Sequence, residues 1–156
     1  MAYSGRYKVK NRSKYKGDPD NVVYRSHWEK LCFKWCDDSS DIIKWCSEEI
    51  VIPYFYDVDK RYHRYFVDLF IETKKGDKLL IEIKPDKETK PPKNPNRSKR
   101  YIKEATTFVK NQNKWEAATK FAKDNGYIFQ VWTENTLKQL GIMKSLTRKK
   151  TVKKSR

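Results

Sequence analysis

Apolar residues recur along the chain with two different periods, and these periods predict the order of helices and strands. One set follows the i, i+3, i+4, i+7 spacing of a single helical face, which predicts a helix over residues 24–36. The residues of this set are Trp28, Leu31, Cys32 and Trp35. A second helical pattern covers residues 102–124 and ends at Asn125-Gly126, a pair that is typical of a helix C-terminus.

Shorter apolar runs predict strands between and after these helices. The runs occupy residues 42–46, 50–56, 62–72, 79–84 and 127–132, and a short helix is predicted over residues 134–140. The third and fourth runs are joined by a turn at Lys75-Gly76-Asp77. The polar segment 1–20 is predicted to be an arm without regular structure, and the polar segment 85–100 is predicted to be a loop. This order predicts an α/β fold, a mixed β-sheet flanked by helices.

The charge of the chain is concentrated in three segments. The 156 residues carry a formal net charge of +16, and basic residues outnumber acidic ones by six to two in residues 1–20 and by eight to two in residues 84–103. Residues 138–156 hold eight basic and no acidic residues, so the rest of the chain is close to neutral. Basic segments around a near-neutral body favour a polyanion as partner, although the excess charge could also serve solubility alone.

The three cysteines are predicted to be buried thiols of a reducing compartment. Cys32, Cys36 and Cys46 are an odd number, their spacing fits no common zinc motif, and no signal peptide precedes them. No apolar run is long enough to cross a bilayer, and no basic amphipathic helix is evident, so no membrane partner is expected.

The predicted hairpin places polar residues within apolar strands. Side chains alternate along a strand, so Glu82 and Lys84 share one face, and a turn centred near Lys75 pairs residues whose numbers sum to about 150. Asp68 and Glu82 then lie side by side with Lys84 one step along. Two carboxylates and a lysine suit Mg²⁺-dependent phosphodiester hydrolysis. The alternative is a solvated cross-strand group of charges without chemistry.

A third acid belongs to the first helix. Ser26-His27-Trp28-Glu29 fits the S-x-x-E capping box, in which Glu29 would accept a hydrogen bond from the backbone of the N-cap residue.

Several separated stretches carry a resemblance. YRSHWE (24–29), VDLF (67–70) and IEIKP (81–85) resemble the PD-(D/E)xK nuclease superfamily, in the branch of transposon-encoded endonucleases. The opening MAYSGRYKVKNRSKYKGDP, VIPYF (51–55), IEIKPDKETKPP (81–92) and WTE (132–134) are similar to the head completion nucleases of T-even-like tailed bacteriophages. The similarity extends to about residue 143.

The resemblance implies a restriction-endonuclease-like core and a set of site residues. In that superfamily Asp68, Glu82 and the carbonyl of Ile83 would hold the metal, Lys84 would act as base or charge stabiliser, and Glu29 would complete or support the site. The proline that names the motif is absent, because Val67 precedes Asp68. The implied cofactor is Mg²⁺, with Mn²⁺ able to substitute.

The resemblance also implies function and partners. The expected activity is a DNA endonuclease with little sequence specificity in phage head completion, working with head or portal vertex proteins in the host cytoplasm or the virion head. The alternative is an assembly protein that grips DNA or the head vertex with an inactive nuclease fold. The implied division is a basic arm at 1–20, a nuclease-like domain at 21–143 and a basic tail at 144–156.

Other residues are weighed beside this set. Arg25 could reach a phosphate or pair with Glu48 or Glu49, and Glu49 is either an extra site acid or a solvated turn residue. His63 and Tyr65 are predicted to face away from Asp68, and Trp115, Ala118 and Phe121 to be core residues. The residues expected to bind DNA are Arg25, Lys87, Lys90, Lys93, Arg97, Lys99 and Arg100.

Overall fold

The structure, a computed structural model, describes residues 3–93 and 98–144 of the chain. The strands in chain order are β1 (Gly5–Arg6), β2 (Val23–Tyr24), β3 (Ile42–Cys46), β4 (Val51–Tyr56), β5 (Arg61–Phe66), β6 (Leu69–Thr73), β7 (Lys78–Ile83) and β8 (Ile128–Trp132). The helices are α1 (His27–Asp38), α2 (Lys99–Asn125) and α3 (Glu134–Gln139), with short 3-10 turns η1 (Arg12–Lys14) and η2 (Asp86–Thr89).

The central sheet is mixed, as the element order predicts. Its strands lie in the order β3-β6-β7-β8, with antiparallel pairs on one side and the parallel pair β7–β8 on the other. The parallel pair needs a crossover connection, which α2 supplies. In the hairpin of β6 and β7, Leu69 pairs with Ile81 and Phe70 with Leu80. The residue numbers of each pair sum to 150, which confirms the predicted register.

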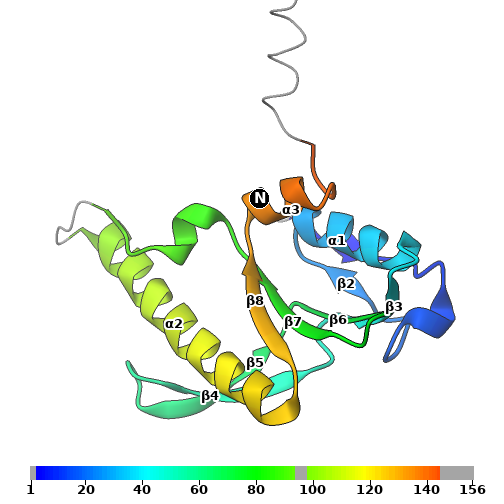
Figure 1. Ribbon diagram of the computed structural model, residues 1–156. Helices are drawn as coiled ribbons and strands as arrows, with labels where there is room; N and C mark the ends of the chain where they lie inside the picture. Colours follow the sequence, from blue (N-terminus) through cyan, green and yellow to red (C-terminus); the bar gives the residue numbers. More distant parts are fainter. Residues whose placement is uncertain (1–2, 94–97, 145–156) are drawn as a thin grey trace, which may run out of the picture.

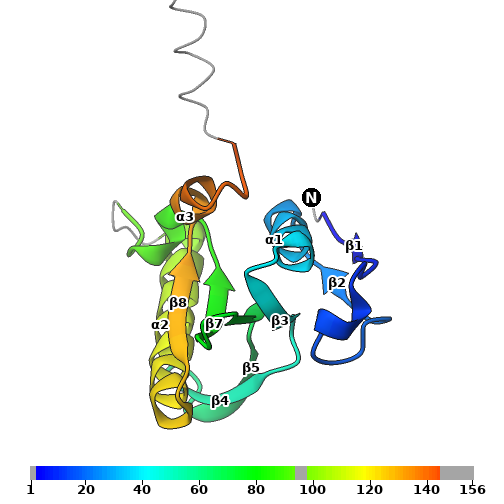
Figure 2. The same ribbon diagram turned by 45° about the vertical axis from the view of Figure 1, so that its right-hand side comes forward.

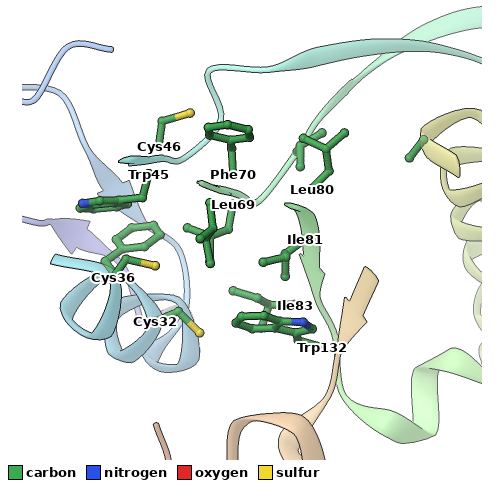
Figure 3. Close-up of a cluster of buried hydrophobic side chains, with 14 of the residues drawn as sticks. Cys32, Cys36, Trp45, Cys46, Leu69, Phe70, Leu80, Ile81, Ile83 and Trp132 are labelled. Carbon is green, nitrogen blue, oxygen red and sulfur yellow. The ribbon is translucent and has the colours of Figure 1, made fainter. Parts of the chain in front are cut away.

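Helices cover both faces of this sheet (Figures 1 and 2). On one face, Cys32 and Cys36 of α1 point toward Leu69, Ile81 and the other apolar side chains of the sheet (Figure 3). On the opposite face lie α2 and the separate two-stranded ribbon of β4 and β5. Burial on both faces explains why the hairpin strands are almost continuously apolar.

The helix ends follow local signals. The hydroxyl of Ser26 accepts a hydrogen bond from Glu29 N at the start of α1, and that of Ser98 accepts one from Tyr101 N at the start of α2. The α2 helix ends at Gly126, whose φ of 74° is in the left-handed region that glycine adopts without strain. The predicted stop is confirmed, and α2 begins three residues before the predicted start because Ser98 caps it.

The strand predicted over residues 62–72 is two strands in different sheets. It separates at Val67-Asp68, with β5 pairing with β4 and β6 joining the central sheet. The backbone of Val67 explains the break, since its N–H donates to Ile50 O and its carbonyl accepts from Glu48 N. The chain therefore bends immediately before Asp68.

The prediction that residues 1–20 lack regular structure is wrong. This segment forms β1 and η1, and the side chains of Val9 and Tyr15 are buried in the core. Its anchor is the buried carboxylate of Asp37, which accepts hydrogen bonds from the Tyr7 hydroxyl and from the backbone N–H groups of Lys10 and Asn11. Apolar residues between the lysines thus bring a basic segment onto the core.

The predicted burial of the cysteines is confirmed, because all three thiols are buried, and all three are free. Burial raises the pKa of Cys32 and Cys46 to about 12 and that of Cys36 well above its ordinary value. Across residues 3–93 and 98–144, no helix has the length and apolar sequence that crossing a bilayer requires.

Candidate active site

Asp68 and Glu82 lie together where β6 begins beside the end of β7. The paired register of the hairpin ends at Leu69–Ile81, and Asp68 and Glu82 are the next residues on either strand, close enough for the charge of Glu82 to act on Asp68. One carboxylate oxygen of Asp68, Oδ2, accepts a hydrogen bond from the backbone N of Ile83 at 2.8 Å. The two acids predicted from the alternation are therefore brought together, and the backbone of β7 fixes the orientation of Asp68.

The Glu82 side chain is buried and held at both oxygens. Its exposed fraction is 4%, its Oε1 accepts a hydrogen bond from the Tyr65 hydroxyl at 2.6 Å, and its Oε2 lies 3.5 Å from Nζ of Lys84. Lys84 is itself anchored, because its backbone N donates to Trp132 O in β8. The lysine of the predicted set is thus in the site.

Tyr65 is a site residue that the sequence prediction missed. It was expected to face away from Asp68, but that expectation assumed a continuous strand through residues 62–72. The bend at Val67-Asp68 changes which side chains share a face, so the hydroxyl of Tyr65 reaches Glu82. Burial, followed by the neighbouring charge of Glu82, raises the pKa of Tyr65, so the hydroxyl remains a donor.

Glu82 is buried and Asp68 beside it is partly buried. Burial and the adjacent charge of Glu82 raise the pKa of Asp68 well above its ordinary value, while the hydrogen bond from Ile83 N and the charge of Lys84 lower it. Desolvation and a like charge both disfavour the ionised form. A cation between these carboxylates would therefore stabilise the site more than Lys84 alone does.

Glu29 stands at the start of α1 and differs from its predicted capping geometry. Its own N–H donates to the Ser26 hydroxyl, but its Oε1 accepts from the backbone N of Arg25 at 2.6 Å, one residue before the predicted donor. Burial and the neighbouring Glu48 carboxylate raise the pKa of Glu29, while the hydrogen bond from Arg25 N lowers it. The negative charge of Glu29 also raises the pKa of Asp68, but within the described residues no hydrogen bond joins the two side chains.

The donor set suits a hard divalent cation. Asp68 and Glu82 offer adjacent carboxylate oxygens, the ligands that Mg²⁺ prefers, and Asp68 is short of compensating charge. Within the described residues, no three or more His, Cys, Asp or Glu side chains gather closely enough to hold a metal ion together. The pair of acids fits the ion, and the addition of Glu29 to that pair stays a prediction.

Other residues weighed from the sequence lie outside this group. Arg25 forms a two-pronged ion pair with Glu48, with Nε–Oε2 at 2.8 Å and a second contact at 3.0 Å, so the pairing alternative is confirmed. His63 contacts Asp59 at 2.7 Å, away from the two acids. Glu49 accepts hydrogen bonds from the Tyr15 hydroxyl and Asp18 N, in the turn setting that was the alternative to a site role.

On the long helix, Ala118 and Phe121 are core residues as predicted, whereas Trp115 is not among the described residues that form the core or pack against it. Ala118 is fully buried, and Phe121 packs against the core and lies near the Tyr127 ring. Trp115 is partly buried, with an indole nitrogen that has no partner within residues 3–93 and 98–144.

Apart from Arg25, the basic residues predicted to bind DNA lie in η2, in the segment after it and at the start of α2. Lys87, Lys93 and Lys99 are exposed, and Arg97 lies outside the described residues, as does the tail after residue 144. Lys90 pairs with Asp86 at 3.0 Å and Arg100 with Glu104 at 3.3 Å, both at the surface. Such exposed pairs are weak, so these side chains remain available to another anion.

Comparisons with known proteins agree with this geometry. The sequence model of the family described as "TnsA-like endonuclease N terminal" matches residues 39–134, a range that includes Asp68, Glu82 and Lys84 but not Glu29. The chain is also 44% identical over 146 residues to the head completion nuclease of Enterobacteria phage T4, a similarity that covers 90% of this chain and 97% of that protein.

Proposed function

The chain belongs to the family of TnsA-like endonuclease N-terminal domains, and on that premise we propose that it is a metal-dependent DNA endonuclease. The observation that carries the proposal is the pair of adjacent carboxylates, Asp68 and Glu82, with the Lys84 ammonium 3.5 Å from Glu82. The 44% identity to a head completion nuclease supports a place in phage head completion after DNA packaging, in the host cytoplasm or the virion head. DNA and head or portal vertex proteins are then the expected partners.

The residues divide the work of phosphodiester hydrolysis. Mg²⁺, or Mn²⁺ in its place, would be held by Asp68, Glu82 and the Ile83 carbonyl with support from Glu29, and would neutralise charge on the scissile phosphate. Tyr65 holds Glu82 in position through its hydroxyl. Lys84 is placed to orient the attacking water or to stabilise charge as the phosphorus–oxygen bond breaks.

Little sequence specificity is expected. The basic residues lie in η2, in the segment after it and at the start of α2 rather than in an array aimed at base edges. Contacts of lysine with phosphates carry no sequence information and weaken as salt rises.

The test is cleavage of supercoiled and linear DNA by the purified chain with Mg²⁺, Mn²⁺ or EDTA. We expect cleavage with either metal and none with EDTA. Asp68→Asn, Glu82→Gln and Lys84→Gln should each lower the rate by about 10²-fold or more, since each removes a charged group from the reacting centre.

Matched controls lie in the turn of the same hairpin. Asp77→Asn and Lys75→Gln change the same residue types at exposed positions and should leave cleavage unchanged. If the wild-type chain binds DNA but cuts neither substrate with either metal, the endonuclease proposal fails and an inactive nuclease fold that grips DNA or the head vertex becomes the better reading.

A further inference from the structure

Two lysines of α2 face the β4–β5 ribbon instead of bulk solvent. Nζ of Lys110 lies 5.0 Å from the ring centroid of Tyr56, and Nζ of Lys114 lies 5.5 Å from that of Tyr65 and 6.0 Å from that of Tyr54. Both lysines are partly buried. The two stand one helical turn apart on the same side of α2, where like charges repel.

These lysines have no acidic partner within 4 Å in the part of the chain that the structure describes. The aromatic faces beneath them attract a cation by about 0.5–1 kcal/mol at exposed sites, which compensates only part of the cost of partial burial. Two half-buried cations without a contacting ion-pair partner in the described residues are the arrangement that an anion completes.

The same surface adjoins the candidate active site. Tyr65, which lies under Lys114, is the residue whose hydroxyl donates to Glu82 at 2.6 Å. Burial lowers the pKa of Lys114, the carboxylates of Glu82 and Asp68 oppose that change, and Lys84 and Lys110 reinforce it. Through the Tyr65 ring beneath it, Lys114 therefore adjoins the two-acid site.

Two hydroxyl groups lie beside the lysines. Tyr54 and Tyr56 are only 3% and 7% exposed as whole residues, and within residues 3–93 and 98–144 neither hydroxyl has a hydrogen-bond partner or is among the buried unpaired atoms, so the hydroxyls lie at the surface. A phenol donates readily to an anionic oxygen. The surface thus offers two cations and two neutral donors.

We propose that Lys110 and Lys114, with the hydroxyls of Tyr54 and Tyr56, bind the DNA backbone next to the Asp68–Glu82 site. Their ligand is the phosphodiester group adjacent to the scissile one, followed by the next phosphate along the same strand. This α2–ribbon track is different from the exposed basic residues of η2 and of the start of α2. It rests on the proposed endonuclease function, because it assigns the path of that enzyme's substrate.

The position of the track in the fold is consistent with a path for one strand. Lys110 and Lys114 lie near the middle of α2, on the part of the helix that contacts β4, and the basic residues at the start of α2 precede them along the helix (Figure 1). A strand bound here would run along the helix and present one phosphate to Asp68 and Glu82.

The experiment is binding of a fluorescent DNA duplex in EDTA, followed by anisotropy over a series of salt concentrations. Lys110→Gln and Lys114→Gln should each weaken binding and lower the slope of log affinity against log salt by roughly one, and the double variant by roughly two. Lys114→Arg keeps the charge over the tyrosine rings and should keep the wild-type slope. Lys123→Gln, an exposed position in the last turn of α2, is the matched control.

The outcomes separate the track from the enzyme activity. If the double variant melts at the wild-type temperature and has the slope of Lys123→Gln, the two lysines bind no phosphate and the inference is overturned, whatever the cleavage assay gives. If the slopes fall as expected but the wild-type chain never cuts, the track stands and the endonuclease proposal fails.

Discussion

Replacing Asp68 by asparagine should stabilise the metal-free protein at neutral pH. The carboxylate of Asp68 is poorly solvated and lies opposite that of Glu82, and both facts raise its pKa above the ordinary value. Asparagine removes the charge but keeps an oxygen that can accept the hydrogen bond from Ile83 N. The change therefore deletes a repulsion and keeps the acceptor for the backbone N–H of Ile83.

The expected gain is modest. Two charges about 5 Å apart, the separation of a cross-strand pair, repel by roughly 3 kcal/mol at an effective dielectric constant of about 20. Lys84, 3.5 Å from Glu82, offsets part of this repulsion, so a net gain of about 1–2 kcal/mol remains. For a chain of this size that corresponds to a rise in melting temperature of roughly 2–8 °C.

The pH dependence follows from the direction of the shift. An acid whose pKa is higher in the folded state holds its proton more tightly there, so stability falls as pH rises through the interval above the unfolded value. The gain of Asp68→Asn should be present at pH 7 and vanish below about pH 4, where Asp68 is protonated in both states.

The assay is urea denaturation in EDTA at pH 7 and pH 3.5, with Asp77→Asn as control. Added Mg²⁺ should raise the stability of the wild-type chain and not that of Asp68→Asn. If Asp68→Asn is less stable than Asp77→Asn at pH 7, the Asp68 carboxylate is not destabilised by desolvation and by repulsion from Glu82. The argument that these two carboxylates need a cation is then refuted.

Three further predictions concern contacts that hold the site and the core. Tyr65→Phe should lower stability by about 2 kcal/mol and slow cleavage, because Glu82 loses a buried donor, while the exposed Tyr62→Phe should change stability by less than about 0.5 kcal/mol; equal effects would contradict this role. Asp37→Ala should cost about 3–5 kcal/mol in urea unfolding by releasing three donors, against less than about 1 kcal/mol for its exposed neighbour in Asp38→Ala. A thiol reagent at pH 8 should modify the buried Cys32, Cys36 and Cys46 only as fast as the protein unfolds. Rapid labelling of the native protein would contradict this, because it would show that at least one of these thiols is accessible.

The hairpin could be predicted because its signals are local. The turn at residues 75–77 and the period of two fix the register through Leu69–Ile81, and Asp68 and Glu82 follow directly after this pair. The same locality holds for the end of α2, where Gly126 marks the stop. A geometry that one short stretch of residues determines can therefore be predicted from the sequence.

Contacts between distant segments were not predictable in this way. Asp37 has the pattern of a surface residue at a helix end, and its burial depends on Tyr7, thirty residues earlier in the chain. The lysines between Tyr7 and Tyr15 mark the segment as solvent-exposed, although the alternate apolar side chains are what pack on the core. Only the folded arrangement of both segments supplies the partners.

The break between β5 and β6 was hidden by apolar residues on both faces, and it is also what assembles the candidate site. Tyr65 and Asp68 are three positions apart, so in one continuous strand their side chains would point to opposite faces. Both are nevertheless directed to Glu82 and Ile83 of β7, because the chain leaves the ribbon at Val67 and enters the central sheet at Leu69. The junction of the two sheets thus brings a buried donor and a second carboxylate to the same acid. Lys114 reaches the same region because α2 packs on the ribbon and the lysine lies over the Tyr65 ring.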